Sequence, residues 1–400
     1  MSKMTPQIRF QGFTDDWEQY NLGELTSWNK GQGLSKDKLT NNGIGDPALH
    51  YADLYKFRPV TGYVIHWTNS KEGRPIPNNS ILFPASDVTP KGLARTTTLD
   101  IPGVKAGGDV IIGQLQQEIN AKFLSYQINA NSNQILPLIT GTTVKHIQSK
   151  NLSTLKVTIP NKDEQNVISR LFDDFENLIV LHQCKLELLK KQKKGFLQKM
   201  FPKNGAKVPK LRFSGFADDW EERKLIEVAD YRNGKAHEKD ISEDGYYIVV
   251  NSKFVSTNGL VKKYSDKMIA PLSKNEIAFV LSDVPNGRAI ARTFLINEDN
   301  KYSLNQRIAG ITPHADTNSY FLHSLMNRNH YFLRFDDGVS QTNLSKREVE
   351  KWVEFYPSYQ EQQKIGSFFK QLDDTIALHQ RKLDLLKEQK KGFLQKMFVS

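Results

Sequence analysis

The feature that most constrains this chain is an internal repeat. Residues 6–18 (PQIRFQGFTDDWE) recur as residues 209–221 (PKLRFSGFADDWE), an offset of 203 positions. Residues 181–201 recur as residues 378–398 at an offset of 197, and 18 of these 21 positions are identical. Chance does not produce such a match, so the chain is a tandem duplication with a unit of roughly 200 residues.

Between these repeated ends the two halves differ strongly. Faint echoes survive: Ser-Asp-Val occurs at residues 86–88 and 282–284, Gly141 matches Gly338, and Pro160 matches Pro357. Two copies that had drifted without acquiring different roles would differ evenly along their length. The observed pattern instead indicates a duplicated structural frame that holds two different functional domains.

Composition narrows the class of protein. The 400 residues are 38% hydrophobic and 25% charged, which is typical of a soluble chain with two or three globular domains. No stretch approaches the roughly 18 apolar residues of a membrane helix, and the N-terminus lacks a signal-peptide core. Cys184 is the single cysteine, which excludes an internal disulfide framework and fits a reducing cytoplasm.

The formal net charge of +11 points to a polyanionic partner, but its location weakens that inference. Residues 182–200 and 379–397 hold nine of the eleven excess positive charges. Helix faces that are simply solvated would look similar, so composition alone favours nucleic acid only weakly.

The repeated ends predict two long helices, at residues 162–200 and 359–397. Apolar side chains recur there every three or four residues, the spacing of a coiled-coil seam. Each seam also includes one histidine and one lysine, which we interpret as register-fixing polar groups and not as catalytic residues. The seam residues that we expect to join the helices are Phe172, Phe175, Ile179, His182, Leu186 and Leu189 in the first, and Phe369, Leu372, Ile376, His379, Leu383 and Leu386 in the second.

Because the two seams are near copies, the simplest partner for each helix is the other. A short polar connector, residues 202–208, leads directly from the first helix into the second half. We therefore expect the helices to pair as an antiparallel coiled coil about a pseudo-two-fold axis, with one divergent domain at each end.

The divergent segments predict mixed α/β domains. Residues 80–83, 109–112, 246–250, 276–281 and 289–295 are β-branched or aromatic runs bounded by turn residues, and we expect strands there. Residues 122–128 and 319–326 favour short helices. The expected fold class is α+β, with a first domain at residues 1–160, a helix at 161–201, a linker at 202–208, a second domain at 209–357 and a helix at 358–400.

Polar loops that mix Gly with Asn, Gln, Lys or Arg lie between the expected strands. These side chains make the contacts that distinguish bases in the major groove of DNA, although ordinary solvent-facing turns have the same composition. The candidate DNA-binding residues are Lys30, Gln32, Arg232, Lys235, His237, Asn286, Arg288, Asn305 and Arg307.

No catalytic signature is present in the sequence. There is no Gly-x-Gly-x-x-Gly cofactor loop, no Walker phosphate loop, no Cys/His metal spacing and no Asn/Asp-Pro-Pro-Tyr motif of an amino-methyltransferase. We therefore expect no catalytic residues, no metal site and no bound cofactor in this chain.

The whole arrangement resembles the specificity subunits of type I restriction-modification enzymes. The motifs are Arg-Phe-x-Gly-Phe-x-Asp-Asp-Trp at residues 9–17 and 212–220, and Leu-Leu-Lys-x-Gln-Lys-Lys-Gly-Phe-Leu-Gln-Lys-Met-Phe at residues 188–201 and 385–398. The resemblance implies a target recognition domain in each half that reads one part of an interrupted double-stranded DNA sequence, with the helices setting the spacing.

The same resemblance implies partners in the bacterial cytoplasm, near the nucleoid, and none in a membrane. Two methyltransferase subunits would bring S-adenosylmethionine, and restriction subunits that use ATP and Mg²⁺ would join the full complex. Adenine methylation and DNA cleavage would belong to those partners. The alternative is a coiled-coil adaptor that joins proteins and has no DNA role. It explains the helices and the missing motifs but not two dissimilar domains with Gly/Asn/Arg loops.

Overall fold

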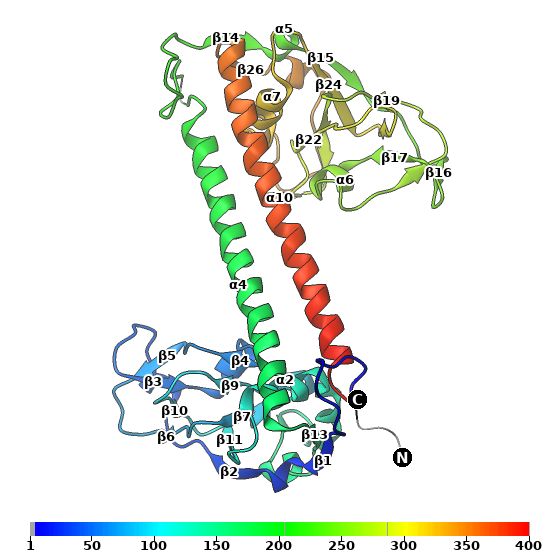
Figure 1. The fold of residues 1–400 in the computed structure, drawn as a ribbon. Coiled ribbons are helices and arrows are strands. Elements are labelled where there is room, and N and C mark those ends of the chain that lie inside the picture. The colour runs from blue at the N-terminus through cyan, green and yellow to red at the C-terminus, as the bar shows by residue number, and fades with distance from the viewer. Residues whose placement is uncertain (1–4, 204, 286, 400) are drawn as a thin grey trace. The chain divides into compact units, whose positions relative to one another are not determined.

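The computed structural model describes residues 5–203, 205–285 and 287–399 (Figure 1). The chain divides into two compact units. The first comprises the residues up to Gln183 together with those from Arg381 onward, and the second runs from Cys184 to Gln380. Each unit therefore contains one divergent domain and one part of each long helix.

The core of the first domain lies around a three-stranded antiparallel sheet in the order β2-β11-β7 (Thr26–Lys30, Val110–Leu115, Ser80–Pro84). Ile112 of the central strand pairs with Asn29 on one side and Leu82 on the other. A four-stranded sheet has the order β5-β3-β10-β6 (His66–Thr68, Asp46–Leu49, Lys105–Ala106, Arg74–Pro75).

Smaller elements complete the first domain. The remaining strands pair as β1 (Glu18–Asn21) with β13 (Lys156–Ile159), β4 (Val60–Thr61) with β9 (Thr98–Leu99), and β8 (Ser86–Asp87) with β12 (Lys145–His146). The helices are α1 (Pro90–Leu93), α2 (Ala121–Ala130), α3 (Ser149–Leu152) and the 3-10 turns Leu22–Glu24, Lys36–Lys38, Tyr51–Tyr55, Ser132–Gln134 and Leu136–Leu138.

The second domain repeats this plan with different loops. A four-stranded antiparallel sheet has the order β15-β24-β20-β22 (Ala229–Asn233, Ile308–Pro313, Ile277–Val280, Thr293–Leu295). A five-stranded sheet has the order β16-β18-β17-β23-β19 (Ile241–Ser242, Tyr264–Ser265, Tyr247–Val250, Tyr302–Leu304, Pro271–Leu272). The other elements are β14 (Glu221–Lys224) paired with β26 (Val353–Tyr356), β21 (Ser282–Asp283) paired with β25 (Thr342–Asn343), and helices α5 (Leu225–Val228), α6 (Ser252–Ser256), α7 (Ser319–Met326), α8 (His330–Leu333) and α9 (Lys346–Glu350).

The two long helices are α4 (Lys162–Lys199) and α10 (Tyr359–Lys396), each of 38 residues. Both have a buried glutamate in the first turn, Glu164 and Glu361, where a negative charge suits the helix dipole. Arg9 and Arg212 hold these carboxylates with two hydrogen bonds each, at 2.7 and 2.8 Å for Arg9 and at 2.8 and 2.7 Å for Arg212. The repeated Arg-Phe motif therefore fastens the start of each domain to the first turn of its helix.

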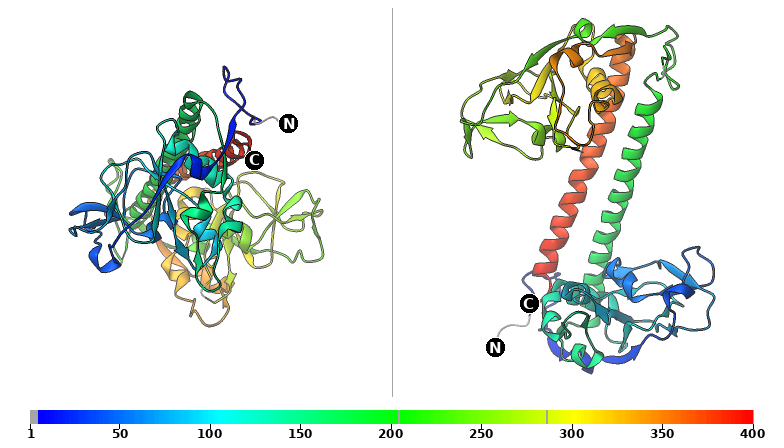
Figure 2. Two further views of the ribbon diagram at one scale, coloured as in Figure 1. Left: turned by 90° about the horizontal axis from the view of Figure 1, so that it is seen from below. Right: turned by 180° about the vertical axis from the view of Figure 1, so that it is seen from behind.

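Within each unit the start of one long helix lies against the end of the other. In the first unit, Phe175 of α4 packs on Phe393 of α10 with ring centroids 5.6 Å apart. The backbone N–H of Ile8 also donates to Lys396 O at 2.9 Å. The N-terminal segment accordingly lies beside the end of α10 (Figure 2). In the second unit, Phe196 of α4 packs on Phe368 of α10, 4.9 Å between centroids.

Most of the expected local elements are confirmed, and one is confirmed only in part. The short helices are α2 and α7, and the expected strands at residues 80–83, 109–112, 246–250 and 276–281 correspond to β7, β11, β17 and β20. The strand expected at residues 289–295 covers only Thr293–Leu295. Ala291 has a φ of 56°, which breaks an extended strand, and the N–H of Arg292 donates to Ala289 O at 3.1 Å to close a turn there.

Candidate nucleic-acid interface

In the first domain, the candidates Lys30 and Gln32 lie on an exposed loop at the end of β2. Lys30 pairs with Asp109 at 3.3 Å, and both side chains are largely exposed. Between them, a Cβ on Gly31 would lie 1.8 Å from Gly107 O. The glycine therefore lets the loop dock on the neighbouring backbone, while the two polar side chains remain at the surface.

The equivalent loop of the second domain is built in the same way. A Cβ on Gly234 would lie 2.0 Å from Asn305 O, so this loop docks on the turn after β23. Lys235 and Arg307 are exposed and Asn305 is half-buried, with the N–H of Lys235 donating to Leu304 O at 3.0 Å. The structure thus brings Lys235, Asn305 and Arg307, from distant parts of the sequence, into one neighbourhood.

Two candidates are held by partners within their own domain, one at the surface and one in the interior. Arg232 donates through Nε to Glu276 Oε1 at 2.7 Å and through Nη2 to Pro271 O at 2.5 Å. His237 is fully buried, and its ring nitrogens lie 2.7 Å from Lys235 O and 2.7 Å from Ser303 Oγ. His237 therefore has no surface to offer to a base, and the expectation of a DNA contact is corrected for it: this side chain positions the loop that includes Lys235.

The loop after β21 holds the last two candidates. Asn286 lies outside the described residues, and Arg288 is exposed. Two further arginines that the sequence did not point to lie nearby: Arg292 contacts Arg288, and Arg328 lies close to Arg292. Arg292 Nε donates to Arg288 O at 2.5 Å, and the N–H of Arg328 donates to Ala291 O at 2.7 Å. The sequence could have pointed to Arg292, because the repeated Ser-Asp-Val is followed by an arginine at a similar distance in both halves, Arg95 in the first and Arg292 in the second.

The seam candidates lie along α4 and α10 with graded burial. The fully or nearly fully buried ones are Phe172, Phe175, Ile179, Leu186, Leu189, Phe369 and Leu383. The half-buried ones are His182, Leu372, Ile376, His379 and Leu386.

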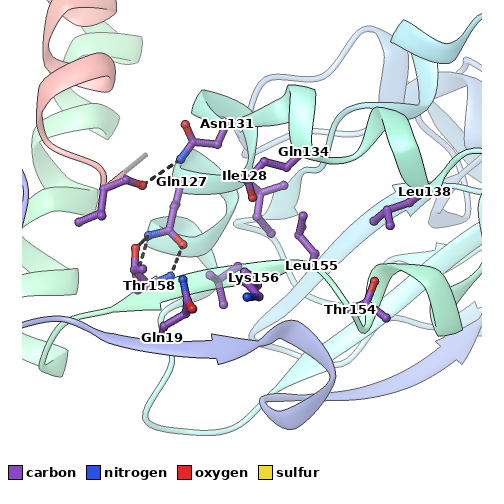
Figure 3. Close-up of a pocket in the computed structure, with 12 residues that line it drawn as sticks. Gln19, Gln127, Ile128, Asn131, Gln134, Leu138, Thr154, Leu155, Lys156 and Thr158 are labelled. Atoms are coloured by element: carbon purple, nitrogen blue, oxygen red, sulfur yellow. Dashed lines mark hydrogen bonds between the residues drawn. The ribbon is translucent and has the colours of Figure 1, made fainter. Parts of the chain in front are cut away.

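A polar pocket of about 390 Å³ lies in the first unit between α2 and β13 (Figure 3). Gln127 clasps the β13 backbone there, with Nε2 donating to Thr158 O at 2.6 Å, and Asn131 donates to Val399 O at 3.2 Å. Lys156 is the one ionisable side chain among the described lining residues. The pocket therefore offers no acid-base pair for catalysis.

The described residues hold neither a cluster of metal ligands nor a membrane-spanning helix. No group of three or more His, Cys, Asp or Glu side chains there is placed to hold a metal ion. Among the described helices, none combines the length and apolarity needed to cross a membrane.

Comparison with known proteins gives consistent matches. A family model for the type I restriction modification DNA specificity domain matches residues 14–191 and 217–388, well over half of the chain. The specificity subunit of the type I restriction enzyme MjaVIII from Methanocaldococcus jannaschii is 29% identical over 230 residues, 55% of this chain. That match spans about half of the relative, 51% of its length.

Solved structures share the fold. The crystal structure of the type I restriction-modification system S subunit from M. genitalium matches with a TM-score of 0.70 and 18% identity, over 99% of this chain and 100% of that one. A structure concerned with complex assembly and conformational transition of the type I R-M system matches with a TM-score of 0.51 and 12% identity, over 98% and 100%.

Proposed function

The chain belongs to the type I restriction modification DNA specificity family, and on this premise we propose that it selects the DNA sequence on which a type I restriction-modification complex acts. Each divergent domain would read one half of a bipartite target. The exposed candidates Lys30, Gln32, Lys235, Arg288, Asn305 and Arg307 are the side chains that we propose for DNA contact.

The observation that carries this proposal is that the structural contacts repeat in both halves while the side chains on the loops differ. The Arg9–Glu164 and Arg212–Glu361 clasps repeat almost atom for atom. The docked loops at Gly31 and Gly234 likewise share their backbone geometry but present different side chains. An identical frame that displays different polar groups suits a protein that reads two different half-sites.

We further propose that α4 and α10 pair along their length as an antiparallel coiled coil. The contacts within each unit support this, since Phe175 meets Phe393 in one and Phe196 meets Phe368 in the other. Such a coiled coil would set the distance between the half-sites and give two equivalent surfaces on which two methyltransferase subunits dock.

Catalysis belongs to those partners in this proposal. The methyltransferase subunits would supply S-adenosylmethionine for adenine methylation, and restriction subunits would supply ATP- and Mg²⁺-dependent cleavage. The described residues of this chain contribute sequence selection and assembly. The proposed location is the cytoplasm, where the DNA is.

The competing function is a coiled-coil adaptor between proteins. It accounts for α4 and α10 but gives no reason for two domains with dissimilar basic loops. The two functions differ in their salt dependence: an adaptor has no reason to bind duplex DNA, whereas phosphate contacts require a steep fall in log K with log salt concentration.

The decisive experiment is to map methylated adenines in the genome of a host that expresses this chain with its methyltransferase. We expect a single interrupted sequence motif, modified only when both proteins are present. Methylation at the same sites without this chain would contradict the proposed function.

A further inference from the structure

A basic site lies in the second domain on the loop between β21 and β22. Asp283 organises this loop: its Oδ2 accepts the N–H of Ala289 at 2.6 Å and of Ile290 at 3.0 Å, and its Oδ1 accepts the N–H of Val284 at 2.9 Å. A Cβ on Gly287 would lie 2.1 Å from this carboxyl group, so only glycine fits there. Val284, Gly287, Ala289 and Ile290 are therefore held against the Asp283 carboxylate, which is engaged by backbone donors.

Three arginines gather at the base of this loop. Arg292 Nε donates to the carbonyl oxygen of Arg288 at 2.5 Å. Arg328, which follows α7, donates through Nη1 to Ile290 O at 3.3 Å and through its N–H to Ala291 O at 2.7 Å. None of the three forms an ion pair with any acidic side chain in the described chain.

The electrostatics of this cluster are unfavourable without an anion. Burial, followed by the neighbouring guanidinium groups of Arg328 and Arg288, lowers the pKa of Arg292. The carboxylate of Asp283 opposes this effect, but it is one negative charge beside three positive ones. Like charges held together in a partly dry environment repel each other, and a bound anion would remove that cost.

The backbone is strained at the same place. Ala291 has a φ of 56° and Arg328 a φ of 59°, and the two residues are joined by the hydrogen bond between Arg328 N–H and Ala291 O. Left-handed conformations are unfavourable for residues with a side chain and concentrate at functional sites. Here they hold two half-buried guanidinium groups beside the exposed Arg288.

We propose that Arg292 and Arg328 form a clamp for one backbone phosphate of the DNA, while Arg288 at the loop surface reaches the adjacent base edge. This inference rests on the proposed DNA-reading function and assigns the anchoring residues of the second domain. Guanidinium groups are suited to this task because they bind phosphate oxygens with paired N–H donors.

The first domain has only part of this site. Its equivalent loop follows Asp87 and includes Lys91 and Arg95, and Arg95 Nη1 donates to Leu54 O at 3.1 Å and also to Tyr55 O. The N–H of Thr96 donates to Asn129 Oδ1 as the N–H of Thr293 donates to Asn327 Oδ1, so Ala130 stands at the position that Arg328 holds in the second domain. The clamp is therefore a property of the second domain, and the two halves of the target are anchored differently.

The test compares binding of the full-length chain, alone and with its methyltransferase, to a cognate and a random-sequence duplex over a salt series. For R292Q/R328Q we expect roughly tenfold weaker binding on both duplexes and a log–log salt slope reduced by about one. R292K/R328K retains the charges and should keep the slope. K301Q is the matched control, because Lys301 of the same domain is already paired with Glu298 at 2.6 Å and should change neither quantity.

The outcomes distinguish failure of the phosphate clamp from failure of the proposed DNA-reading function. If the wild-type chain shows salt-dependent binding but R292Q/R328Q keeps the wild-type slope, the clamp is overturned and the DNA-reading function stands. A loss confined to the cognate duplex would make these arginines base readers and also overturn the clamp. If the wild-type chain binds no duplex in either form, both the clamp and the proposed function are wrong. Equal thermal unfolding temperatures for R292Q/R328Q and R292K/R328K would confirm that the comparison is not between folded and unfolded proteins.

Discussion

Lys193 of α4 and Asp373 of α10 form an ion pair, with Nζ 2.5 Å from Oδ1 and 2.7 Å from Oδ2. Its counterpart in the first unit joins Lys390 of α10 to Glu176 of α4. Lys193 and Lys390 are separated by the repeat offset of 197 residues, and so are Glu176 and Asp373. The duplication has therefore kept the contact between helices as well as the helices themselves.

This pair should be measurably coupled. Asp373 also accepts the hydroxyl of Tyr320 at 2.8 Å, and the Lys193 and Asp373 side chains are only 22% and 27% exposed. We expect K193M to lower the free energy of unfolding by about 1–2 kcal/mol, between the values for exposed and buried pairs. A double-mutant cycle with D373N, followed by denaturant unfolding, should show a coupling of about 1 kcal/mol. Additive effects would mean that the ion pair contributes nothing.

The sequence predicted the two long helices better than it predicted the DNA-contacting residues. The helix bounds followed from the spacing of Phe172, Phe175 and Ile179, because a repeated apolar period leaves few alternatives. Arg232 and His237 are residue types that often contact DNA, yet each is held by a partner in its own domain, Glu276 for Arg232 and Ser303 for the buried His237. Those partners lie 44 and 66 residues away in the sequence, and a local sequence pattern does not predict a contact over such a separation.

The purified chain should not bind S-adenosylmethionine or modify DNA by itself. The reason is the absence of a cofactor loop in the sequence, together with a pocket whose only ionisable lining residue in the described chain is Lys156. Isothermal titration of the chain with S-adenosylmethionine checks this. Micromolar binding would contradict the division of labour between this chain and its methyltransferase.

The proposed coiled coil should act as a ruler. Inserting two heptads after Gln183 and again after Gln380, positions related by the repeat, keeps both seams in phase and adds about 21 Å. We expect the unread gap of the methylated motif to grow by about six base pairs, at about 3.4 Å each. A three-residue insertion at the same points is the control, since it rotates the seam and should abolish methylation. An unchanged gap after the two-heptad insertion would exclude the helices as the ruler.

Arg288 should determine one base of one half-site. As an exposed side chain at a rigid loop, its change to alanine should cost about 1–3 kcal/mol on the cognate site and relax a single position of the motif. Methylation mapping with the R288A variant reads this directly. A uniform loss on every sequence would place Arg288 with the phosphate clamp instead, and no loss would make it an ordinary solvated turn residue.

Residues 1–202 expressed alone should form a homodimer. In the first unit, Phe398 stacks on Phe172 at 5.5 Å and Lys390 pairs with Glu176, so this half without a partner would expose its core. A second copy supplies the missing groups: Phe201 and Lys193 stand at the repeat positions of Phe398 and Lys390.

In the second unit, residues near the end of α4 already make the contacts that a second copy would have to supply. Phe201 stacks on Phe369 at 5.9 Å there, and Leu211 N–H donates to Lys199 O just as Ile8 N–H donates to Lys396 O. The dimer would hold two identical recognition domains, so with the methyltransferase it should modify a palindromic interrupted site made of the first half-site twice. Sedimentation and methylation mapping of residues 1–202 measure both properties, and K193E is the matched variant that should weaken the dimer by opposing Glu176. A monomeric half, or a dimer that methylates a non-palindromic site, would refute the antiparallel pairing of α4 and α10.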